Sequence, residues 1–145
     1  MATDRRAEVT WNGSLMEGSG TIDSTTSGML GKQPVSWAAR STDETGGKTS
    51  PEELIAAAHA ACFSMALSSG LAKADHPPEE LKTTATVTFQ PGEGITKIAL
   101  TVVGRVPGID AAVFEEIAQD AKSNCPVSQA LAGVPEITLD ASLAS

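Results

Sequence analysis

The pattern of apolar and polar positions changes along the chain, from short alternating segments to one long apolar run and back to alternation. The segments 5–11, 14–24 and 33–41 are short and bounded by turn residues, and Asn12-Gly13 is a strong hairpin signal between the first two. They predict three strands, with Arg40 near the end of the third. A polar, glycine-containing loop over 42–49 then leads into the apolar run.

The apolar run predicts one long helix over residues 50–69. Ser50 suits the N-cap, Pro51 the first helical position, and Glu53 completes the pattern of a capping box. Alanines fill most of the middle at almost no cost in helix propensity, and Gly70 is expected to cap the C-terminus. Because no residue between Leu54 and Leu67 is charged, we expect a central helix that is covered on all sides.

The remainder of the chain returns to alternation and then to a second helical pattern. Strands are predicted over 81–90 and 95–106, joined by a PGEG turn, and a final strand over 136–143. A helix is expected from Asp110 to about Asn124, and a short one from Pro126 to about Ala132. This order of elements predicts an α+β fold with mostly antiparallel pairing, in a single domain over 1–145.

Composition and charge remove several classes of function. The chain has 145 residues and a formal net charge of −8, so a nucleic-acid partner is not expected, and an anionic membrane surface is disfavoured. The N-terminal residues contain charges without a following apolar run, so we expect no signal peptide. Residues 54–72 are rich in Ala, Ser and Gly and are too weakly apolar to predict a membrane span. We therefore expect a cytoplasmic protein.

The chain contains two cysteines, and each falls on a predicted helix. Cys62 lies in the middle of the long helix, where a single buried cysteine is most often a small apolar side chain. Cys125 precedes Pro126 and occupies the N-cap position of the short helix, where the helix N-terminus lowers the pKa of a thiol. In the cytoplasm, two such cysteines indicate a reactive or metal-binding site before a structural disulfide.

Other kinds of site fit the sequence less well than a redox site. The chain has neither glycine-rich phosphate-binding motif, and Ser64 and Ser68 lie outside any serine-hydrolase motif. A zinc site could combine His59, Cys62, Cys125 and His76, but there is no second closely spaced pair of ligands, so no metal is expected. His59 is interpreted as a satisfied helix residue or as an accessory polar group near the thiol.

A peroxide-reducing site requires a thiolate, a second thiol and a cation. The thiolate is the nucleophile, and a nearby thiol converts its sulfenic acid to a disulfide before further oxidation. Since desolvation raises the pKa of a thiol, a cation must hold the thiolate against an apolar helix. Arg40 is the best-placed of the ten lysines and arginines. From the residues alone, an equally good interpretation is that Arg40 is a solvent-facing arginine at the end of a strand.

The segments PEELIAAAHAACFSMALS and NCPVSQAL resemble the osmotically inducible protein C (OsmC) family of peroxidases, which are kin to the organic hydroperoxide resistance proteins. The resemblance extends over nearly the whole chain, including WNGSLMEGSGTIDSTTSG near the N-terminus. It implies that Cys62 is the peroxidatic cysteine and Cys125 the resolving cysteine. It also implies that Arg40 stabilises the thiolate and that Glu52 orients the arginine.

The same resemblance implies the fold, the partners and the reaction. The expected fold is an intertwined homodimer with antiparallel sheets wrapped around two central helices, without metal or prosthetic group. The expected activity is a thiol peroxidase of the oxidative and osmotic stress response, which reduces organic hydroperoxides and, less well, hydrogen peroxide. A dithiol of the lipoyl or thioredoxin type would reduce the Cys62–Cys125 disulfide. The alternative is a non-enzymatic oxidant sensor or apolar-ligand-binding module on the same fold.

Helix geometry supports the dimer. Glu52 and Cys62 lie ten residues apart on the predicted helix, which is about 15 Å of helical rise. Without a helix breaker between them, Glu52 must act on the Cys62 of a second chain. Apolar side chains near Cys62 favour an organic substrate over hydrogen peroxide; they are Ala58, Ala61, Phe63, Met65 and Ala66.

Overall fold

The computed structural model describes all residues 1–145, and the chain divides into two compact units, Met1–Leu54 and Ile55–Ser145. Each unit contains its own three-stranded sheet, with the order β1-β2-β3 in the first unit and β4-β5-β6 in the second. The mixture of sheets and helices confirms the predicted α+β class.

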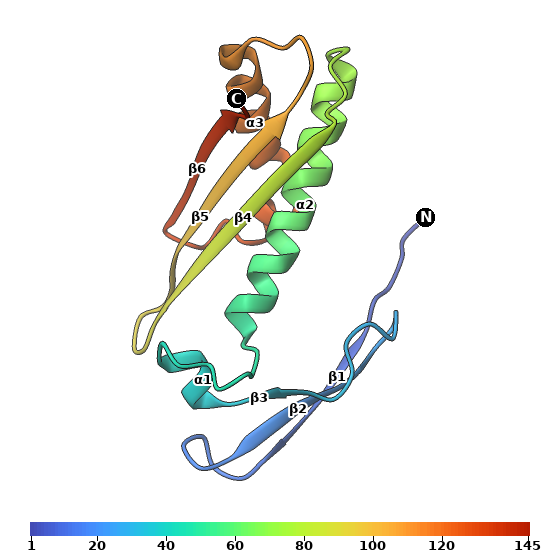
Figure 1. The fold of residues 1–145 in the computed structure, drawn as a ribbon. Helices are drawn as coiled ribbons and strands as arrows, with labels where there is room; N and C mark the ends of the chain where they lie inside the picture. Colours follow the sequence, from blue (N-terminus) through green and yellow to red (C-terminus); the bar gives the residue numbers. More distant parts are fainter. The chain divides into compact units, whose positions relative to one another are not determined.

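The first unit is built on an antiparallel sheet of β1 (Ala7–Asn12), β2 (Ser19–Thr25) and β3 (Gln33–Val35) (Figure 1, blue to light blue). The predicted hairpin at Asn12-Gly13 is present, since Asn12 pairs with Ser19 across the connection and Gly13 has a φ of 89°. The second strand begins later than predicted, because residues 14–18 form a turn closed by the Gly18 N–H donating to the Ser14 carbonyl.

The predicted third strand is wrong beyond Val35. Residues Trp37–Ser41 form a short helix, α1, and Arg40 therefore lies on a helix. The Ser36 side chain caps this helix by accepting a hydrogen bond from the Ala39 N–H at 3.1 Å. A serine that satisfies the backbone in this way favours a helix start over the continuation of a strand, and this outweighs the loose alternation in the sequence.

The long helix α2 (Pro51–Lys73) begins where the sequence predicts and ends later. The Ser50 hydroxyl accepts from the Glu53 N–H at 3.2 Å, which confirms the N-cap. In a complete capping box the Glu53 carboxylate would accept from the Ser50 N–H. Here it accepts from the Thr49 hydroxyl at 2.8 Å. Gly70 is not the C-cap but an interior residue, because α2 continues to Lys73. A Cβ on Gly70 would lie 2.9 Å from Ile117 Cγ2.

In the second unit, β4 (Glu80–Gln90) and β5 (Gly94–Arg105) form the predicted antiparallel hairpin. The final strand β6 (Glu136–Leu143) pairs with β5 in parallel, which is the exception to the predicted antiparallel pairing. Between β5 and β6 lie α3 (Ala111–Asn124), whose N-cap Asp110 accepts from the Ala112 N–H, and α4 (Pro126–Ala130). The predicted bounds of these elements are confirmed to within about two residues at each end.

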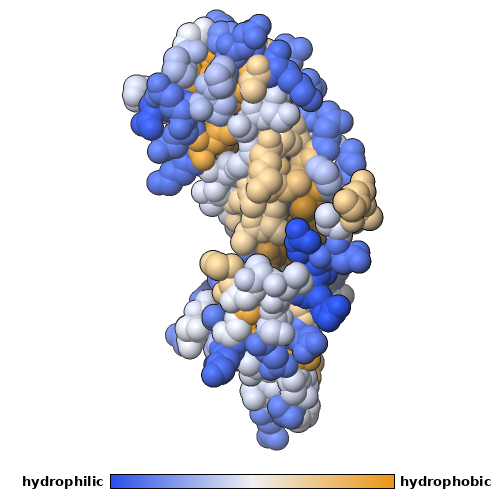
Figure 2. All heavy atoms as spheres, turned by 90° about the vertical axis from the view of Figure 1, so that its right-hand side faces the viewer, coloured by the Kyte–Doolittle hydropathy of each residue, from blue (hydrophilic) through white to orange (hydrophobic).

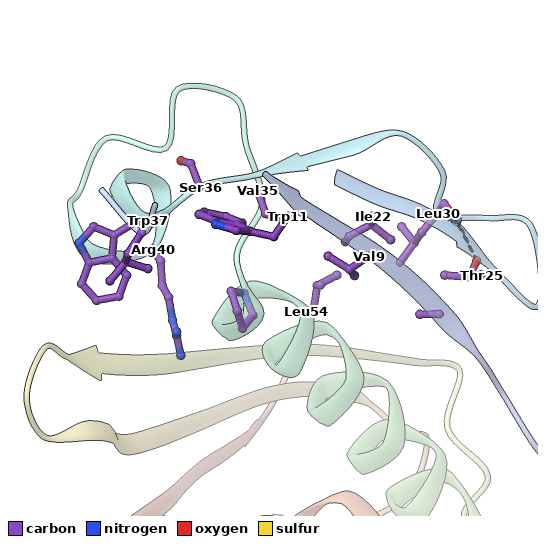
Figure 3. A pocket seen from close by; sticks show the side chains of 13 residues that line it. Val9, Trp11, Ile22, Thr25, Leu30, Val35, Ser36, Trp37, Arg40 and Leu54 are labelled. Carbon is purple, nitrogen blue, oxygen red and sulfur yellow. Dashed lines mark hydrogen bonds between the residues drawn. The ribbon is translucent and has the colours of Figure 1, made fainter. Parts of the chain in front are cut away.

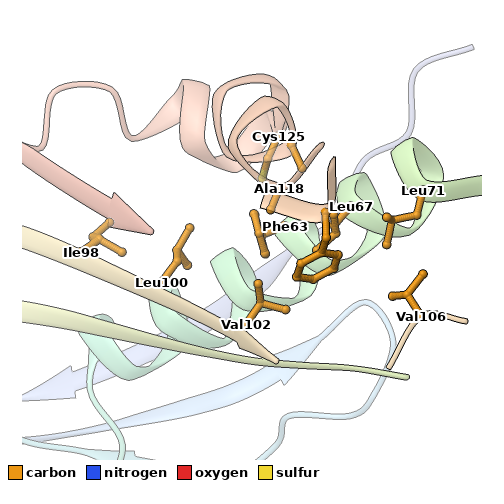
Figure 4. Packing of buried hydrophobic residues seen from close by; sticks show 11 residues of the cluster. Phe63, Leu67, Leu71, Ile98, Leu100, Val102, Val106, Ala118 and Cys125 are labelled. Carbon is orange, nitrogen blue, oxygen red and sulfur yellow. The ribbon is translucent and has the colours of Figure 1, made fainter. Parts of the chain in front are cut away.

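The hydrophobic core of the second unit lies between α2, α3 and the sheet, and Figure 4 shows its side chains. Each of these elements contributes apolar residues with almost no exposure: Phe63, Leu67 and Leu71 from α2; Ile98, Leu100 and Val102 from β5; Phe114 and Ala118 from α3. Burying each large side chain contributes about 1.5–3 kcal/mol. This packing fixes the face of α2 that carries the core residues and the position of α3 beside it.

The opposite face of α2 is exposed in the single chain, so the expected cover on all sides is not complete. Ala57, Ala58 and Ala61 are exposed, and Met65 is 73% exposed. Figure 2 shows apolar atoms along this part of the surface. By length and composition α2 could cross a membrane, a test that core helices also pass. Because its other face is packed in the core, α2 is a core helix with one apolar face uncovered.

Candidate functional site

The structure brings the two cysteines together. Cys62 lies in the middle of α2 and Cys125 at the N-cap of α4, and their sulfur atoms form a hydrogen bond of 2.9 Å. Both are free thiols. Cys62 is partly exposed, whereas Cys125 has no exposed surface and belongs to the core (Figure 4). The pair therefore has one sulfur accessible from outside and one sulfur held behind it.

The surroundings of Cys125 favour its thiolate. Burial by itself raises the pKa of this thiol, but several hydrogen bonds outweigh burial and leave the pKa below its ordinary value. The groups that lower the pKa are Cys62, Ser128 and Val127. Val127 and Ser128 belong to the first turn of α4, so the lowering predicted for a helix N-cap is present.

The surroundings of Cys62 have the opposite effect. Burial is the main cause that raises the pKa of the Cys62 thiol, and the hydrogen bond and negative charge of Cys125 raise it further, while the Val127 N–H opposes them. Within the second unit the lower thiol pKa therefore belongs to Cys125 rather than to Cys62. A nucleophilic Cys62 therefore needs a cation beyond these groups.

Arg40 and Glu52 form the second predicted pair. The Arg40 Nε donates to both carboxylate oxygens of Glu52, at 3.0 and 3.2 Å, and Nη2 donates to Oε1 at 2.9 Å. Glu52 is buried in the first turn of α2, and the Arg40 side chain is 33% exposed. Two donors on one carboxylate fix the plane of the guanidinium, so Glu52 sets the orientation of Arg40. The resemblance implied that Glu52 orients Arg40, and in the structure the two side chains are in direct contact.

An apolar pocket in the first unit was not predicted. Its volume is about 550 Å³, and Arg40 contributes to its wall (Figure 3). The rest of the wall is mainly apolar and comes from the sheet, α1 and the first turn of α2, with Val9, Trp11, Ile22, Leu30, Trp37 and Leu54 among its residues. The alternation of Val9 and Trp11 on β1 is the sequence signal that could have indicated one apolar sheet face.

His59 and Ser128 form a buried polar pair beside the cysteines. His59 has no exposed surface, and its Nε2 lies 2.7 Å from the Ser128 Oγ. Desolvation lowers the pKa of His59, which favours the neutral ring. The sequence suggested His59 as an accessory group near the thiol and missed Ser128, because the 69 residues that separate them hide the contact. No three side chains of the kind that bind metals come together in the structure.

Comparisons with known proteins place this geometry in a family. Residues 43–140 match the family of OsmC-like proteins. The peroxiredoxin OsmC of Escherichia coli is 49% identical, and the alignment covers 100% of both chains. The organic hydroperoxide resistance protein OhrA of Bacillus subtilis is 33% identical over 63% of this chain and 66% of its own.

A solved structure shares the fold over almost the whole chain. The organic hydroperoxide resistance protein OhrB of Bacillus subtilis superposes with a TM-score of 0.61 at 25% identity, covering 96% of this chain and 98% of its own. The resemblance seen in the two cysteine segments is thus confirmed across the chain by a family match, a full-length relative and a shared fold. This chain belongs to the OsmC-like protein family.

Proposed function

We propose that this protein is a cysteine-based peroxidase that reduces organic hydroperoxides to alcohols, with Cys62 as the peroxidatic and Cys125 as the resolving cysteine. The observation that carries the proposal is the 2.9 Å contact between a partly exposed and a fully buried sulfur. The predicted peroxidase function is confirmed at the level of its relatives, one named a peroxiredoxin and others named for organic hydroperoxide resistance.

The reaction proceeds in three balanced steps. The Cys62 thiolate attacks the terminal oxygen of the hydroperoxide, the O–O bond breaks, and the alkoxide takes a proton and leaves as the alcohol. The Cys125 thiolate then attacks the sulfur of the Cys62 sulfenic acid, and hydroxide leaves and is protonated to water. A dithiol of the lipoyl or thioredoxin type reduces the resulting disulfide and is itself oxidised. No metal or prosthetic group takes part.

Accessibility supports Cys62 as the first nucleophile. Cys125 has the lower thiol pKa in the second unit, but it has no exposed surface for a hydroperoxide to reach. Cys62 is partly exposed, although burial raises its pKa. The reaction therefore requires a cation that favours the Cys62 thiolate.

The Arg40–Glu52 pair supplies that cation in a homodimer. Glu52 and Cys62 are ten residues apart on α2, about 15 Å of helical rise, so the pair serves the Cys62 of a second chain. The exposed apolar face of α2 around Met65 supports this arrangement, because a second copy would cover it. The whole chain 1–145 acts as one domain of an intertwined dimer with two central helices.

Apolar surface favours organic substrates over hydrogen peroxide. Ala58, Ala61 and Met65 are exposed on the same helix as Cys62 and offer few hydrogen-bond donors. Phe63 is excluded from this surface, contrary to the prediction, because its side chain is completely buried in the core. The apolar pocket beside Arg40 adds space of a size suited to an organic group.

The same pocket supports the second candidate, an oxidant sensor or apolar-ligand-binding module without turnover. The two candidates differ in stoichiometry. A peroxidase consumes many equivalents of hydroperoxide per chain when a dithiol is supplied, whereas a sensor or binding module consumes about one. In either case we place the protein in the cytoplasm, where dithiol reductants and oxidative and osmotic stress responses operate.

The experiment that tests the peroxidase cycle is intact-mass analysis after one equivalent of cumene hydroperoxide. The wild-type protein should lose two hydrogens, the mass change of one disulfide. Cys62→Ser should remain unchanged, and Cys125→Ser should gain one oxygen and then stall unless a small thiol is added. A wild-type protein that keeps both thiols after exposure would exclude this assignment.

A further inference from the structure

The cysteine pair and the His59–Ser128 pair form two parallel links between the same two segments. His59 lies three residues before Cys62 on α2, and Ser128 lies three residues after Cys125, in the first turn of α4. The sulfur–sulfur link measures 2.9 Å and the His59 Nε2–Ser128 Oγ link 2.7 Å. The polar link therefore lies one helical turn from the reacting sulfurs along each segment.

Both members of the polar link are buried, and one atom in it has no partner. Ser128 is 8% exposed and His59 is not exposed at all. The Nδ1 atom of His59 is buried without any hydrogen-bond partner. A histidine that served only to satisfy its own polar atoms would not leave one ring nitrogen unpaired in the interior, because that costs free energy. The Ser128 Oγ is therefore the hydrogen-bond partner that the structure gives the His59 ring.

The unpaired Nδ1 also decides the direction of the hydrogen bonds. If Nδ1 carried the proton, the interior would contain an unpaired N–H and the Ser128 hydrogen would be drawn toward Nε2. If Nε2 carries it, only an acceptor is left unpaired, and Nε2–H donates to the Ser128 Oγ. The Ser128 hydrogen is then free to be directed toward Cys125, three residues earlier in the chain, whose thiol pKa the Ser128 hydroxyl lowers. The second arrangement satisfies more donors.

We propose that Ser128 is a catalytic residue whose hydroxyl donates a hydrogen bond to the Cys125 sulfur during resolution, and that His59 is the positioning residue that orients this hydroxyl through its Nε2–H. The inference rests on the proposed peroxidase cycle and specifies how its second step is assisted. Cys125 forms the S–S bond, the S–O bond of the Cys62 sulfenic acid breaks, and the hydroxide takes a proton from solvent. His59 and Ser128 keep their own protons throughout.

A spectroscopic test requires no turnover. Long-range ¹H–¹⁵N correlation spectra of the reduced wild-type protein distinguish the two neutral tautomers of His59, and His59→Gln identifies its signals beside those of His76. The expected result is a neutral ring with the proton on Nε2. A proton on Nδ1, or a positively charged ring at neutral pH, would overturn the proposal, because Ser128 would then face a different partner or a buried charge.

A kinetic test follows the fate of the Cys62 sulfenic acid under excess cumene hydroperoxide. Sulfinic acid and disulfide form in competition, and intact mass separates them. Losing one hydrogen bond to the thiolate reduces the thiolate fraction about tenfold, but the remaining thiolate is more nucleophilic, so resolution slows about threefold. Ser128→Ala and His59→Leu should therefore raise the ratio of sulfinic acid to disulfide about threefold. The rate of the first oxidation should not change.

Conservative variants and a matched control separate this role from simple packing. Ser128→Thr keeps the hydroxyl, and His59→Gln keeps a donor near the Nε2 position. Both variants should therefore give a ratio of sulfinic acid to disulfide close to that of the wild-type protein. Ser64→Ala removes a partly buried serine of α2 that bonds Ala60 and Thr83 instead, and it should behave as wild type. A Ser128→Ala protein that partitions like wild type would overturn the inference, even if His59→Leu fails to fold. A wild-type protein that never forms the disulfide would instead reject the proposed cycle.

Discussion

The two units of the chain bury their apolar side chains to very different extents. The second unit contains a continuous core contributed by α2, α3, β5 and Cys125, with many residues at or near zero exposure. In the first unit the buried apolar residues are Ile22 and Ala39, and every residue of β1 is exposed, with Val9 at 59% and Trp11 at 40%. The second unit therefore has a continuous core between its sheet and its helices, whereas the first unit has few buried apolar side chains.

This difference in burial bears on the proposed homodimer. A sheet with one apolar face is stable only when another element covers that face. The second unit covers its sheet with α2 and α3, although one apolar face of α2 stays exposed, and it also holds both sulfurs. The first unit holds the Arg40–Glu52 pair next to an open apolar pocket. The unit with the cation thus has the less covered sheet, and in the proposed homodimer a partner chain would cover it.

We expect the largest effect on peroxidase activity from mixing two inactive variants, one changed in the first unit and one changed in the second. Glu52→Ala and Cys62→Ser homodimers should both be strongly impaired. Mixing them under conditions of proven subunit exchange should restore peroxidase activity, because one site then combines Cys62 from one chain with Glu52 from the other. Steady-state consumption of cumene hydroperoxide measures the recovery. No recovery despite exchange, or a monomer at micromolar concentration, would exclude a shared site.

Removing the cation from the first unit should have a large but smaller effect. Arg40→Ala should slow alkylation of Cys62 at neutral pH by about tenfold or more, because an opposite charge favours the thiolate. Arg40→Lys should slow it less, although a lysine cannot match the two-donor contact with Glu52. Iodoacetamide kinetics in a Cys125→Ser background measure this rate. If both variants react like wild type, Arg40 does not serve Cys62.

Packing within the second unit should make Gly70→Ala destabilising despite the better helix propensity of alanine. The new Cβ would lie 2.9 Å from Ile117 Cγ2, a methyl group on a stiff, β-branched side chain. We expect a net loss of about 1 kcal/mol in the free energy of unfolding, measured in urea. The matched control is Gly133→Ala, whose Cβ would meet nothing within 4 Å and which should be neutral or slightly stabilising. Ile117→Leu in the Gly70→Ala background should recover part of the loss.

The smallest effect concerns the buried histidine of the second unit. Burial lowers the pKa of His59 from its ordinary value of 6.5, so the unfolded chain binds this proton more readily than the folded protein. Neutral His59 therefore contributes to the free energy of unfolding in full at pH values above 6.5. This contribution is lost as the pH falls below 6.5 toward the pKa of the folded protein. Urea unfolding at about pH 8 and about pH 5 should show a smaller acid-induced loss in His59→Gln than in wild type. An equal loss in both proteins would contradict this.

The sequence by itself determined the elements whose signals are local. Ser50 and Pro51 mark the start of α2, Asp110 marks the start of α3, and strict alternation marks β4. Cys125 before Pro126 also identified an N-cap thiol with a lowered pKa. Each of these features depends on residues within about four positions of one another, where backbone hydrogen bonding and periodicity act.

Tertiary structure decided the features that depend on residues far apart in the chain. The Cys62–Cys125 contact spans 63 residues and the His59–Ser128 contact 69, so no local pattern encodes either distance. Gly70 reads locally as a helix end, but α2 continues past it to Lys73, and Ile117 lies close against it. Likewise, the parallel pairing of β6 with β5 follows from the helices between them returning the chain in the same direction. These outcomes were set by packing of the core, which selects one partner for each face among many that the sequence allows.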